Sequence, residues 1–494
     1  MTLFDTSTGA TGPGTASAKR IPKGDQAVRD SLWKRLVLTF LGTYAALLLV
    51  AGLGQITDPF IHYDDYPALV LDAEAYYEKT LAEGRWFSYL WHLRGIETPA
   101  WVNFQLYLVG WSLFVAAAAL NVFRTGELRF PLLLSVLVVL SPQTTLISGW
   151  FNSLIPGIWL MAAYTVTALF VSPRVGRWLL VPFVPVAIQA YTPYPFLMLA
   201  VCLMREDRDR SFAELVRLVL TFIAAFALGL FVIFTINYMV HGVFGVALAE
   251  WRDPNPANDL GGYIRNLPKL AESLHWTYQM TGFGQPALAL FIAAAFVASL
   301  AIIWRADRLE VLSILLGIAS GLSLLSLHAM QEGILFPFRS TYFLWFLICI
   351  ALFRAAWLLR TSTRQRSSAA FAGLVILALL IGSMVRIHHQ TLSAWQVETR
   401  RIAAQIPQTT GIVYIYGSYL ALNGTGQSRA QMPRDFSFRL EHLRGFQTQM
   451  CTQAPEDCAD IAPPFDVAAS TGARRIESVG DTTFILLPGF EDDS

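Results

Sequence analysis

Long apolar stretches recur along this sequence, and several of them contain no charged side chain. They lie at about 36–57, 100–123, 130–148, 150–171, 213–240, 285–304, 309–328, 339–359 and 368–387. A helix of about 20 apolar residues spans the ~30 Å hydrocarbon core of a bilayer. Only 14% of the residues are charged, whereas soluble domains contain about 25%. The sequence therefore predicts a polytopic membrane protein.

One further apolar stretch is interrupted by polar residues and prolines. Residues 178–204 form two short apolar halves, which fit either one kinked helix or a pair of short helices. Lys and Arg concentrate in the cytoplasmic loops of membrane proteins, and only the pair keeps all the basic loops on one side. We therefore predict the pair, and 11 transmembrane helices in total. The basic loops are those at Arg124/Arg129, Arg174/Arg177, Arg205/Arg208/Arg210, Arg305/Arg308 and Arg360/Arg364/Arg366.

The two ends of the chain are more polar than its middle. Residues 1–33 lack apolar periodicity and contain a basic flank, so we expect a disordered cytoplasmic tail before a membrane domain at 34–387. After 11 crossings, residues 388–494 lie on the outer side. Their pattern predicts a small α/β domain with a helix at 391–405, a strand at 411–417 and a hairpin around Gly480-Asp481.

Charge and cysteine usage exclude several classes of protein. The net charge of +1 is too small to create a positive electrostatic potential that would attract nucleic acid, so we expect no nucleic-acid partner. Four cysteines are too few for a disulfide scaffold, and none has zinc-ligand spacing. Cys451 and Cys458 both lie in the outer domain, where disulfides persist, and we predict that they pair. The alternative is two reduced, buried thiols.

Two adjacent carboxylates follow the first apolar stretch, within Ile61-His62-Tyr63-Asp64-Asp65-Tyr66-Pro67. Carboxylates at a membrane edge are costly unless they have a function, and either aspartate could accept the proton of a hydroxyl nucleophile as a general base. In a purely structural interpretation, Asp65 caps a short helix with Pro67 in its first turn while Asp64 is solvated. The residues alone favour neither interpretation.

These aspartates form part of a pattern that resembles a known enzyme family. The first span, Asp64-Asp65 and then Gly84-Arg85-Trp86 resemble the opening of the GT-C membrane glycosyltransferases. More narrowly, they resemble the Gtr-type glucosyltransferases that decorate the O-antigen of bacterial lipopolysaccharide from a polyprenyl-phosphate donor. The similarity covers about 36–390 and continues through Ser141-Pro142-Gln143, Gln189-Ala190-Tyr191 and Pro337-Phe338-Arg339.

The resemblance implies an inverting glycosyl transfer at the outer leaflet of a bacterial inner membrane, with a periplasmic C-terminus. Asp64 or Asp65 would deprotonate the acceptor hydroxyl of a glycan while polyprenyl phosphate leaves. A fixed cation near the leaving phosphate would lower the barrier, and Arg339 is the first candidate and Arg85 the second, because guanidinium binds phosphate bidentately. Each arginine also fits an interfacial, snorkelling position. A divalent metal is possible but not indicated.

Other polar and aromatic residues near the membrane are candidates for binding sugar or acceptor. Amides and carboxylates can bind a sugar ring, although such residues often satisfy free backbone groups at helix breaks. The tryptophans also fit the aromatic belt of the interface, and residues 249–284, with Tyr263, Leu267, Leu270 and Leu274 at helical spacing, predict an interfacial helix beside the site. The candidates are Tyr63, Trp86, Gln143, Gln189, Tyr191, His328, Gln331 and Glu332.

Three other functions are compatible with the pattern. A transporter also has many spans and broken helices, but transporters usually have charged residues inside the spans or repeated halves. Here charged residues are nearly absent from the interior of the spans, and no half-pattern recurs. In a flippase-like or scaffolding protein Asp64 and Asp65 would be dispensable. A transferase of mannose or arabinose would keep the enzyme class, because nothing in the residues distinguishes these sugars from glucose.

Overall fold

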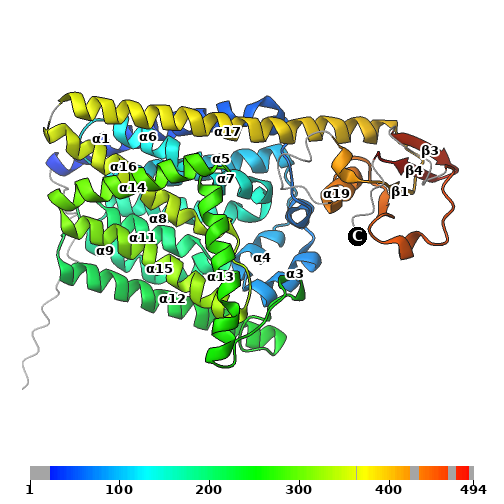
Figure 1. Cartoon of the computed structure of the whole chain (residues 1–494), viewed down its shortest axis with the longest axis horizontal. Helices are drawn as coiled ribbons and strands as arrows, with labels where there is room; N and C mark the ends of the chain where they lie inside the picture. The colour runs from blue at the N-terminus through cyan, green and yellow to red at the C-terminus, as the bar shows by residue number, and fades with distance from the viewer. Residues whose placement is uncertain (1–22, 363, 423–432, 466–473, 489–494) are drawn as a thin grey trace, which may run out of the picture.

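The computed structural model describes residues 23–362, 364–422, 433–465 and 474–488. Within these residues, eight helical segments are long and apolar enough to cross a membrane, and their helices run side by side in one bundle (Figure 1). The bundle is built from α1 (Lys23–Thr57), α5 (Ala100–Val122), α8 (Phe151–Phe170), α12 (Phe212–His241), α14 (Pro286–Ala306), α15 (Arg308–Glu332), α16 (Tyr342–Ser362) and α17 (Arg364–Gln405).

Three apolar helices of the bundle are shorter than a full crossing. They are α6 (Arg129–Val139), α10 (Leu180–Ala190) and α11 (Tyr194–Met204), each 11 residues long. Eleven residues rise about 16 Å, roughly half of the hydrocarbon thickness. Eight spanning segments and three half-length helices therefore replace the predicted 11 full crossings in the described chain.

The structure contains the predicted pair of helices within 178–204. α9 (Pro173–Trp178) leads into α10, and α10 ends where Tyr191 adopts an extended conformation. α11 then begins and packs against α10. The predicted span at 130–148 is also broken, because α6 ends at Val139 and α7 (Pro142–Ile147) and η2 (Ser148–Trp150) lead into α8.

The predicted tail at 1–33 is too long, because α1 begins at Lys23. The basic residues that precede the first apolar stretch, such as Arg29, Lys34 and Arg35, are therefore part of α1. Residues 1–22 of the predicted tail lie outside the described residues.

The predicted basic loops lie together at one end of the bundle. Arg124 pairs with Asp207, Arg210 with Asp307, and Arg360 with Glu127, at N–O distances of 3.0, 2.5 and 2.8 Å. These ion pairs join loops that are far apart in the sequence. The arrangement agrees with the positional bias of Lys and Arg from which the topology was predicted.

Short helices cover the opposite end of the bundle (Figure 1). α13 runs across the direction of the long helices, and it corresponds to the interfacial helix predicted within 249–284. Leu267 and Leu274 on α13 are exposed, which suits a helix lying at the membrane surface. The short helices are η1 (Tyr63–Asp65), α2 (Tyr66–Leu69), α3 (Ala73–Glu83), α4 (Trp86–His92), η3 (Glu250–Arg252), α13 (Leu260–Thr281) and η4 (Phe338–Thr341).

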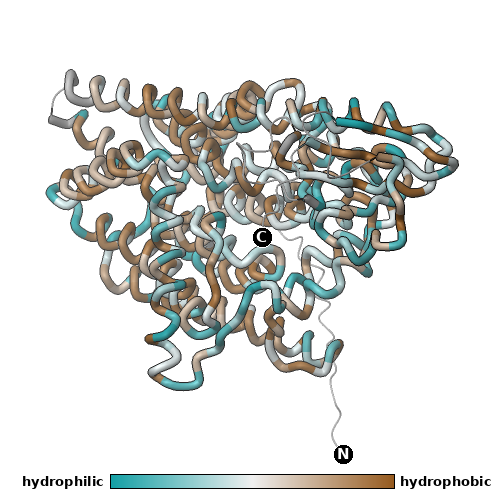
Figure 2. Tube along the Cα trace, turned by 45° about the vertical axis from the view of Figure 1, so that its right-hand side comes forward, coloured by the Kyte–Doolittle hydropathy of each residue, from teal (hydrophilic) through white to brown (hydrophobic). Residues whose placement is uncertain are grey.

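The C-terminal domain is attached through an unbroken helix. The domain was predicted to begin at residue 388 with a separate helix at 391–405, but α17 continues from the bundle to Gln405 and carries the domain beyond its end (Figure 1). In Figure 2 the domain is more hydrophilic than the helices of the bundle.

A four-stranded mixed sheet forms the centre of this domain, in the order β2-β1-β4-β3. β1 is parallel to β2 and β4, whereas β3 and β4 form the predicted antiparallel hairpin. The elements are β1 (Ile412–Tyr416), η5 (Tyr419–Ala421), α19 (Pro433–Arg444), β2 (Gln447–Met450), η6 (Pro455–Cys458), β3 (Arg475–Val479) and β4 (Thr482–Leu486).

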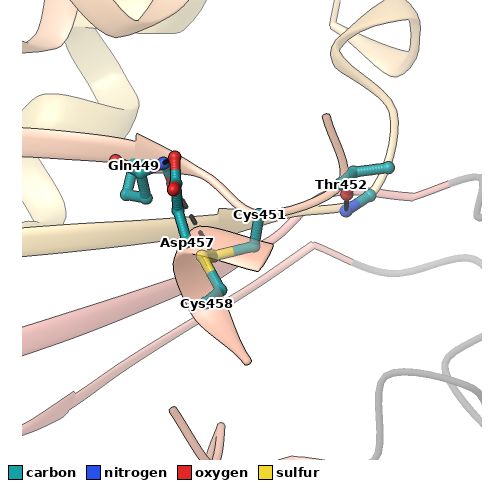
Figure 3. The surroundings of a disulfide bond; sticks show 6 residues. Gln449, Cys451, Thr452, Asp457 and Cys458 are labelled. Atoms are coloured by element: carbon teal, nitrogen blue, oxygen red, sulfur yellow. Dashed lines mark hydrogen bonds between the residues drawn. A yellow bond between two sulfur atoms is a disulfide. The ribbon is translucent and has the colours of Figure 1, made fainter. Parts of the chain in front are cut away.

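The predicted disulfide is confirmed. Cys451 and Cys458 are bonded, with their Cα atoms 5.5 Å apart, and the bond joins the end of β2 to η6 (Figure 3). The amide of Gln449 donates to the Asp457 carboxylate at 2.8 Å beside it. The irregular connection after β2 is therefore fixed to the sheet at two points.

Candidate active site

The segment that carries the acidic pair is folded against the start of α8. His62 is extended, and its backbone N–H donates to the carbonyl of Gly149 at 2.9 Å. η1 then turns the chain through Asp64 and Asp65, and α2 begins with Pro67 in its first turn. This anchoring places both aspartates next to the loop that precedes α8.

Asp65 is fully buried and belongs to the framework of the site. Its Oδ1 accepts the backbone N–H of Ser153 at 2.8 Å, and its Oδ2 accepts that of Asn152 at 2.8 Å. The interpretation of Asp65 as a cap of the helix with Pro67 is wrong, because Asp65 forms no side-chain cap on α2. Its carboxylate instead accepts from the first turn of α8, where a negative charge is favourable. Burial raises the pKa of Asp65 to about 7, against the hydrogen bonds of Ser153 and Asn152, which favour ionisation.

Asp64 is more accessible, with a side chain 30% exposed. Its Oδ1 bonds Nδ1 of His62 at 2.5 Å and accepts from the indole N–H of Trp150, and its Oδ2 accepts from the Lys79 ammonium at 3.2 Å. Burial opposes ionisation, but the hydrogen bond with His62 and the charge of Lys79 outweigh it and hold the pKa of Asp64 below its usual value. Asp64 is therefore an ionised carboxylate at neutral pH.

Trp150 joins the two charged residues of the predicted site. Its indole N–H binds Asp64, and the guanidinium carbon of Arg339 lies 4.8 Å from the centre of its ring. Within the described part of the chain, Arg339 has no carboxylate partner. An ionised carboxylate and an unpaired cation thus contact the same side chain.

Arg339 also lines a small pocket with two other predicted residues, Gln143 and Tyr191. Both polar atoms of the Gln143 amide are buried there without a hydrogen-bond partner, as are the hydroxyls of Tyr191 and Tyr194. An unpaired buried polar group is costly. These polar atoms lie behind a mainly apolar lining, and a ligand that widened this small pocket could satisfy them.

A second small pocket adjoins the first, and the two share Trp111 and Thr144 in their linings. Its lining is also mainly apolar, with Leu47, Phe104 and Val385 among its side chains, and it includes Ser148 and His389. The two cavities together form a mainly apolar space with a few polar groups at its edges.

Arg85 reaches the site more indirectly than Arg339. Its guanidinium lies 5.5 Å from the ring centre of Tyr191, but its Nε is paired with the Glu83 carboxylate at 2.5 Å. Burial disfavours the charge, and Glu83 outweighs this effect and holds the pKa of Arg85 above its usual value. The charge of Arg85 is thus already neutralised within the protein.

Trp86, Gln189 and Tyr63 have other partners. The indole N–H of Trp86 donates to the side-chain oxygen of Asn237 at 2.7 Å, and the Gln189 amide donates to the carbonyl of Pro185 at 2.7 Å. The backbone N–H of Tyr63 donates to the Asp435 carboxylate at 2.5 Å, beside the C-terminal domain. None of these three contacts reaches Arg339.

The remaining candidates lie near the end of α15. Gln331 accepts a hydrogen bond from the Tyr263 hydroxyl and donates to the carbonyl of Ala257 at 3.3 Å. The backbone carbonyl of Glu332 accepts from Asn255, and the side chain of His328 is exposed. These residues hold the segment before α13, and no contact joins them to Asp64 in the described chain.

Two residues of the site, His62 and Lys79, were not among the predicted ones, and Trp150 was expected only as one of several tryptophans near the membrane interface. His62 stands two positions before Asp64, and this proximity was the available signal. Lys79 and Trp150 come from other elements, and only the fold brings them to Asp64. Among the described residues, no group of three or more His, Cys, Asp or Glu side chains could hold a metal ion.

Comparison with known proteins finds no matching family model, no matching curated protein and no matching solved structure. The chemistry of the site must therefore be inferred from its geometry. That geometry combines an ionised carboxylate, a guanidinium without a carboxylate partner among the described residues, and two small adjoining pockets.

Proposed function

We propose that this protein is an inverting glycosyltransferase of the GT-C type, which moves a hexose, with glucose as the first candidate, from a polyprenyl-phosphate donor to a surface glycan. The observation that supports this most directly is the contact of both Asp64 and Arg339 with Trp150, beside a pocket with unpaired polar groups. A group transfer between a hydroxyl and a phosphate needs a proton acceptor and an anion-stabilising group close together.

Arg339 is the phosphate-binding residue in this proposal. The leaving polyprenyl phosphate gains negative charge as its bond to the sugar breaks, and a guanidinium without an internal carboxylate partner is free to stabilise that charge. Arg85 is less suited to this role because Glu83 already pairs with it.

We place the hexose beside Arg339, next to Gln143, Tyr191 and Tyr194. Gln143 can donate and accept at the same time, and the two tyrosine hydroxyls can do either. These groups are buried and unpaired, so the hydroxyls of a sugar that widens this small pocket would satisfy them. The adjoining, mainly apolar pocket would receive the first part of the polyprenyl chain.

Asp64 lies where the proton of the acceptor hydroxyl is taken up in this proposal. Asp65 holds the backbone that positions Asp64. Asp65 is buried and holds the N-terminus of α8, whereas Asp64 is ionised and partly exposed. The basic loops at the opposite end of the bundle suit a cytoplasmic location. In the proposed orientation the site therefore faces the periplasm of a bacterial inner membrane.

The test is transfer of labelled glucose from synthetic polyprenyl-phosphate-glucose to a lipid-linked glycan in proteoliposomes. We expect wild-type protein to transfer glucose and Arg339→Ala to lower turnover by about 10²–10³-fold. Arg265→Ala is the matched control, because Arg265 lies on α13 with a side chain 65% exposed, and we expect its rate to change by less than about twofold.

Two outcomes would contradict the proposal. Wild-type protein that transfers no sugar from a panel of polyprenyl-phosphate hexoses, but moves the lipid-linked donor across the bilayer, would be a flippase. Equal rates for Arg339→Ala and Arg265→Ala would remove Arg339 from the site.

A further inference from the structure

His62 and Asp64 form a rigid pair at the proton-accepting end of the site. Nδ1 of His62 lies 2.5 Å from Oδ1 of Asp64, and the imidazole stacks on Trp150 with ring centres 4.1 Å apart. The backbone of His62 is fixed by its hydrogen bond to Gly149. Both the position and the orientation of the ring are therefore set by the fold.

The oxygens of Asp64 are already occupied by donors. Oδ1 accepts from Trp150 and contacts His62, and Oδ2 accepts from Lys79. Hydrogen bonds to a carboxylate stabilise its charged form and make it a weaker base. Three of the roughly four acceptor positions of this carboxylate are thus in use, and the contacts that stabilise its charge make Asp64 a poor proton acceptor.

The second ring nitrogen of His62 is free. Because an ionised carboxylate can only accept, Nδ1 carries the proton of the bond to Asp64, and the lone pair of a neutral ring is on Nε2. No described residue forms a hydrogen bond with Nε2, and this atom keeps some exposed surface in a side chain that is 9% exposed. The arrangement has the form of a base oriented by a carboxylate.

We propose that Nε2 of His62 is the general base of the reaction and that Asp64 is its positioning carboxylate, an inference that rests on the proposed glycosyl transfer. The acceptor oxygen forms a bond to the anomeric carbon as the bond from that carbon to the phosphate oxygen breaks. The proton of the acceptor hydroxyl moves to Nε2, and the electron pair of the broken bond stays on polyprenyl phosphate. The imidazolium then returns its proton to water.

Other charged groups near His62 act on this equilibrium. Asp64 stabilises the imidazolium, whereas Lys79 and Arg339 disfavour it. Tyr63 contacts the ring with centres 4.6 Å apart, and Asp435 and Arg434 approach from α19 through Tyr63. Among these groups, only Asp64 forms a hydrogen bond with the imidazole. Its carboxylate is therefore the main charge that stabilises the protonated ring.

The test is the pH dependence of transfer in proteoliposomes. A base must be neutral to accept a proton, so we expect the wild-type rate to fall as the pH is lowered, and this fall is the acid limb of the pH profile. His62→Asn retains an N–H near the position of Nδ1 but has no Nε2. We expect it to lower turnover by about 10²–10⁴-fold and to abolish the acid limb.

Two further variants separate a base from a structural residue. Asp64→Asn should move the acid limb to lower pH by about one unit or more, because the imidazolium loses its carboxylate. The double variant His62→Asn/Asp64→Asn should be no slower than His62→Asn by more than about threefold, since the two residues act as one unit. His275→Asn, at an exposed position of α13, should keep the wild-type profile.

The outcomes distinguish this inference from the proposed function. A wild-type protein that transfers sugar, together with a His62→Asn variant that keeps the acid limb and most of the rate, would overturn the role of His62 alone. An absence of transfer by wild-type protein at every pH would overturn the glycosyltransferase itself, and with it this inference.

Discussion

Asp65 and Asn152 are joined by two hydrogen bonds. Oδ2 of Asp65 accepts from the backbone N–H of Asn152 at 2.8 Å and from its side-chain amide at 2.9 Å. The side-chain oxygen of Asn152 accepts from the amide of Asn103 on α5 at 2.9 Å. The site therefore rests on a buried network that links η1, α8 and α5, and Asp64 is the residue next to it.

Asp65→Asn should change the pH dependence of stability. The pKa of Asp65 is about 7 in the folded chain, compared with about 3.9 in an unfolded one. The folded protein therefore holds a proton that the unfolded chain has lost. This stabilisation is fully present below about pH 4 and is lost as the pH rises to about 7.

The measurement is the apparent unfolding temperature of both proteins in detergent between pH 4 and 8. We expect the advantage of wild type over Asp65→Asn to shrink as the pH rises. An advantage that grows with pH would mean that the carboxylate is ionised throughout. Asp64→Asn at the same pH values is the control for a general effect of removing one charge.

Trp150→Phe should separate the two contacts of the indole. Phenylalanine keeps a ring against His62 and Arg339 but lacks the N–H that Asp64 accepts. A hydrogen bond to a charged group contributes about 1.5–3 kcal/mol, so we expect transfer to fall by about tenfold or more with little change in unfolding temperature. An unchanged rate would show that this bond has no part in the reaction.

Hydropathy and charge were sufficient to predict most of the helices. The pair at 178–204, the helix within 249–284 and the Cys451–Cys458 disulfide are all present. The continuous α17 was missed, because the end of an apolar run marks where a membrane would end and not where a helix ends. A polar helix can continue beyond the bilayer without any change in backbone hydrogen bonding.

The site was only partly predictable. Gln143, Tyr191 and Arg339 were each proposed from the sequence, but their common pocket depends on contacts between four parts of the chain. The different roles of the two aspartates depend on Asn152, 87 residues beyond Asp65. No local pattern indicates which of two neighbouring side chains points into such a contact.

Arg339→Lys and Arg85→Lys should have different effects. Lysine keeps the charge but not the planar guanidinium that binds two phosphate oxygens. For Arg339→Lys we expect a rise of about tenfold or more in the KM for the polyprenyl-phosphate donor. Arg85 is paired with Glu83. For Arg85→Lys we therefore expect a lower unfolding temperature and a KM for the donor close to that of wild type. The reverse pattern would make Arg85 the phosphate-binding residue.

Reduction of the disulfide should weaken the C-terminal domain locally. The bond closes a loop with a sequence separation of 7, and short loops of this kind are stabilised by about 2 kcal/mol. We expect Cys451→Ser/Cys458→Ser to expose the connection after β2 to protease sooner than in wild type. Cleavage rates identical in both proteins, with and without reductant, would contradict this. Protection of α12 in the bundle should be unchanged.

Asp58 joins the membrane bundle to the C-terminal domain, because its Oδ2 accepts from both Arg439 and Arg400. The Arg439 side chain is only 3% exposed, so Asp58→Asn would leave a buried guanidinium without its carboxylate. Breaking a buried ion pair from one side costs about 3–5 kcal/mol. We therefore expect faster hydrogen exchange in α19, and a slower transfer rate, since Asp435 of α19 holds the backbone of Tyr63 next to Asp64.

The control variant is Arg474→Gln, which removes a more exposed ion pair with Glu398. Hydrogen exchange in α19 of this variant should match that of wild type. Equal exchange in Asp58→Asn and Arg474→Gln would show that the two domains are held together by their apolar contacts.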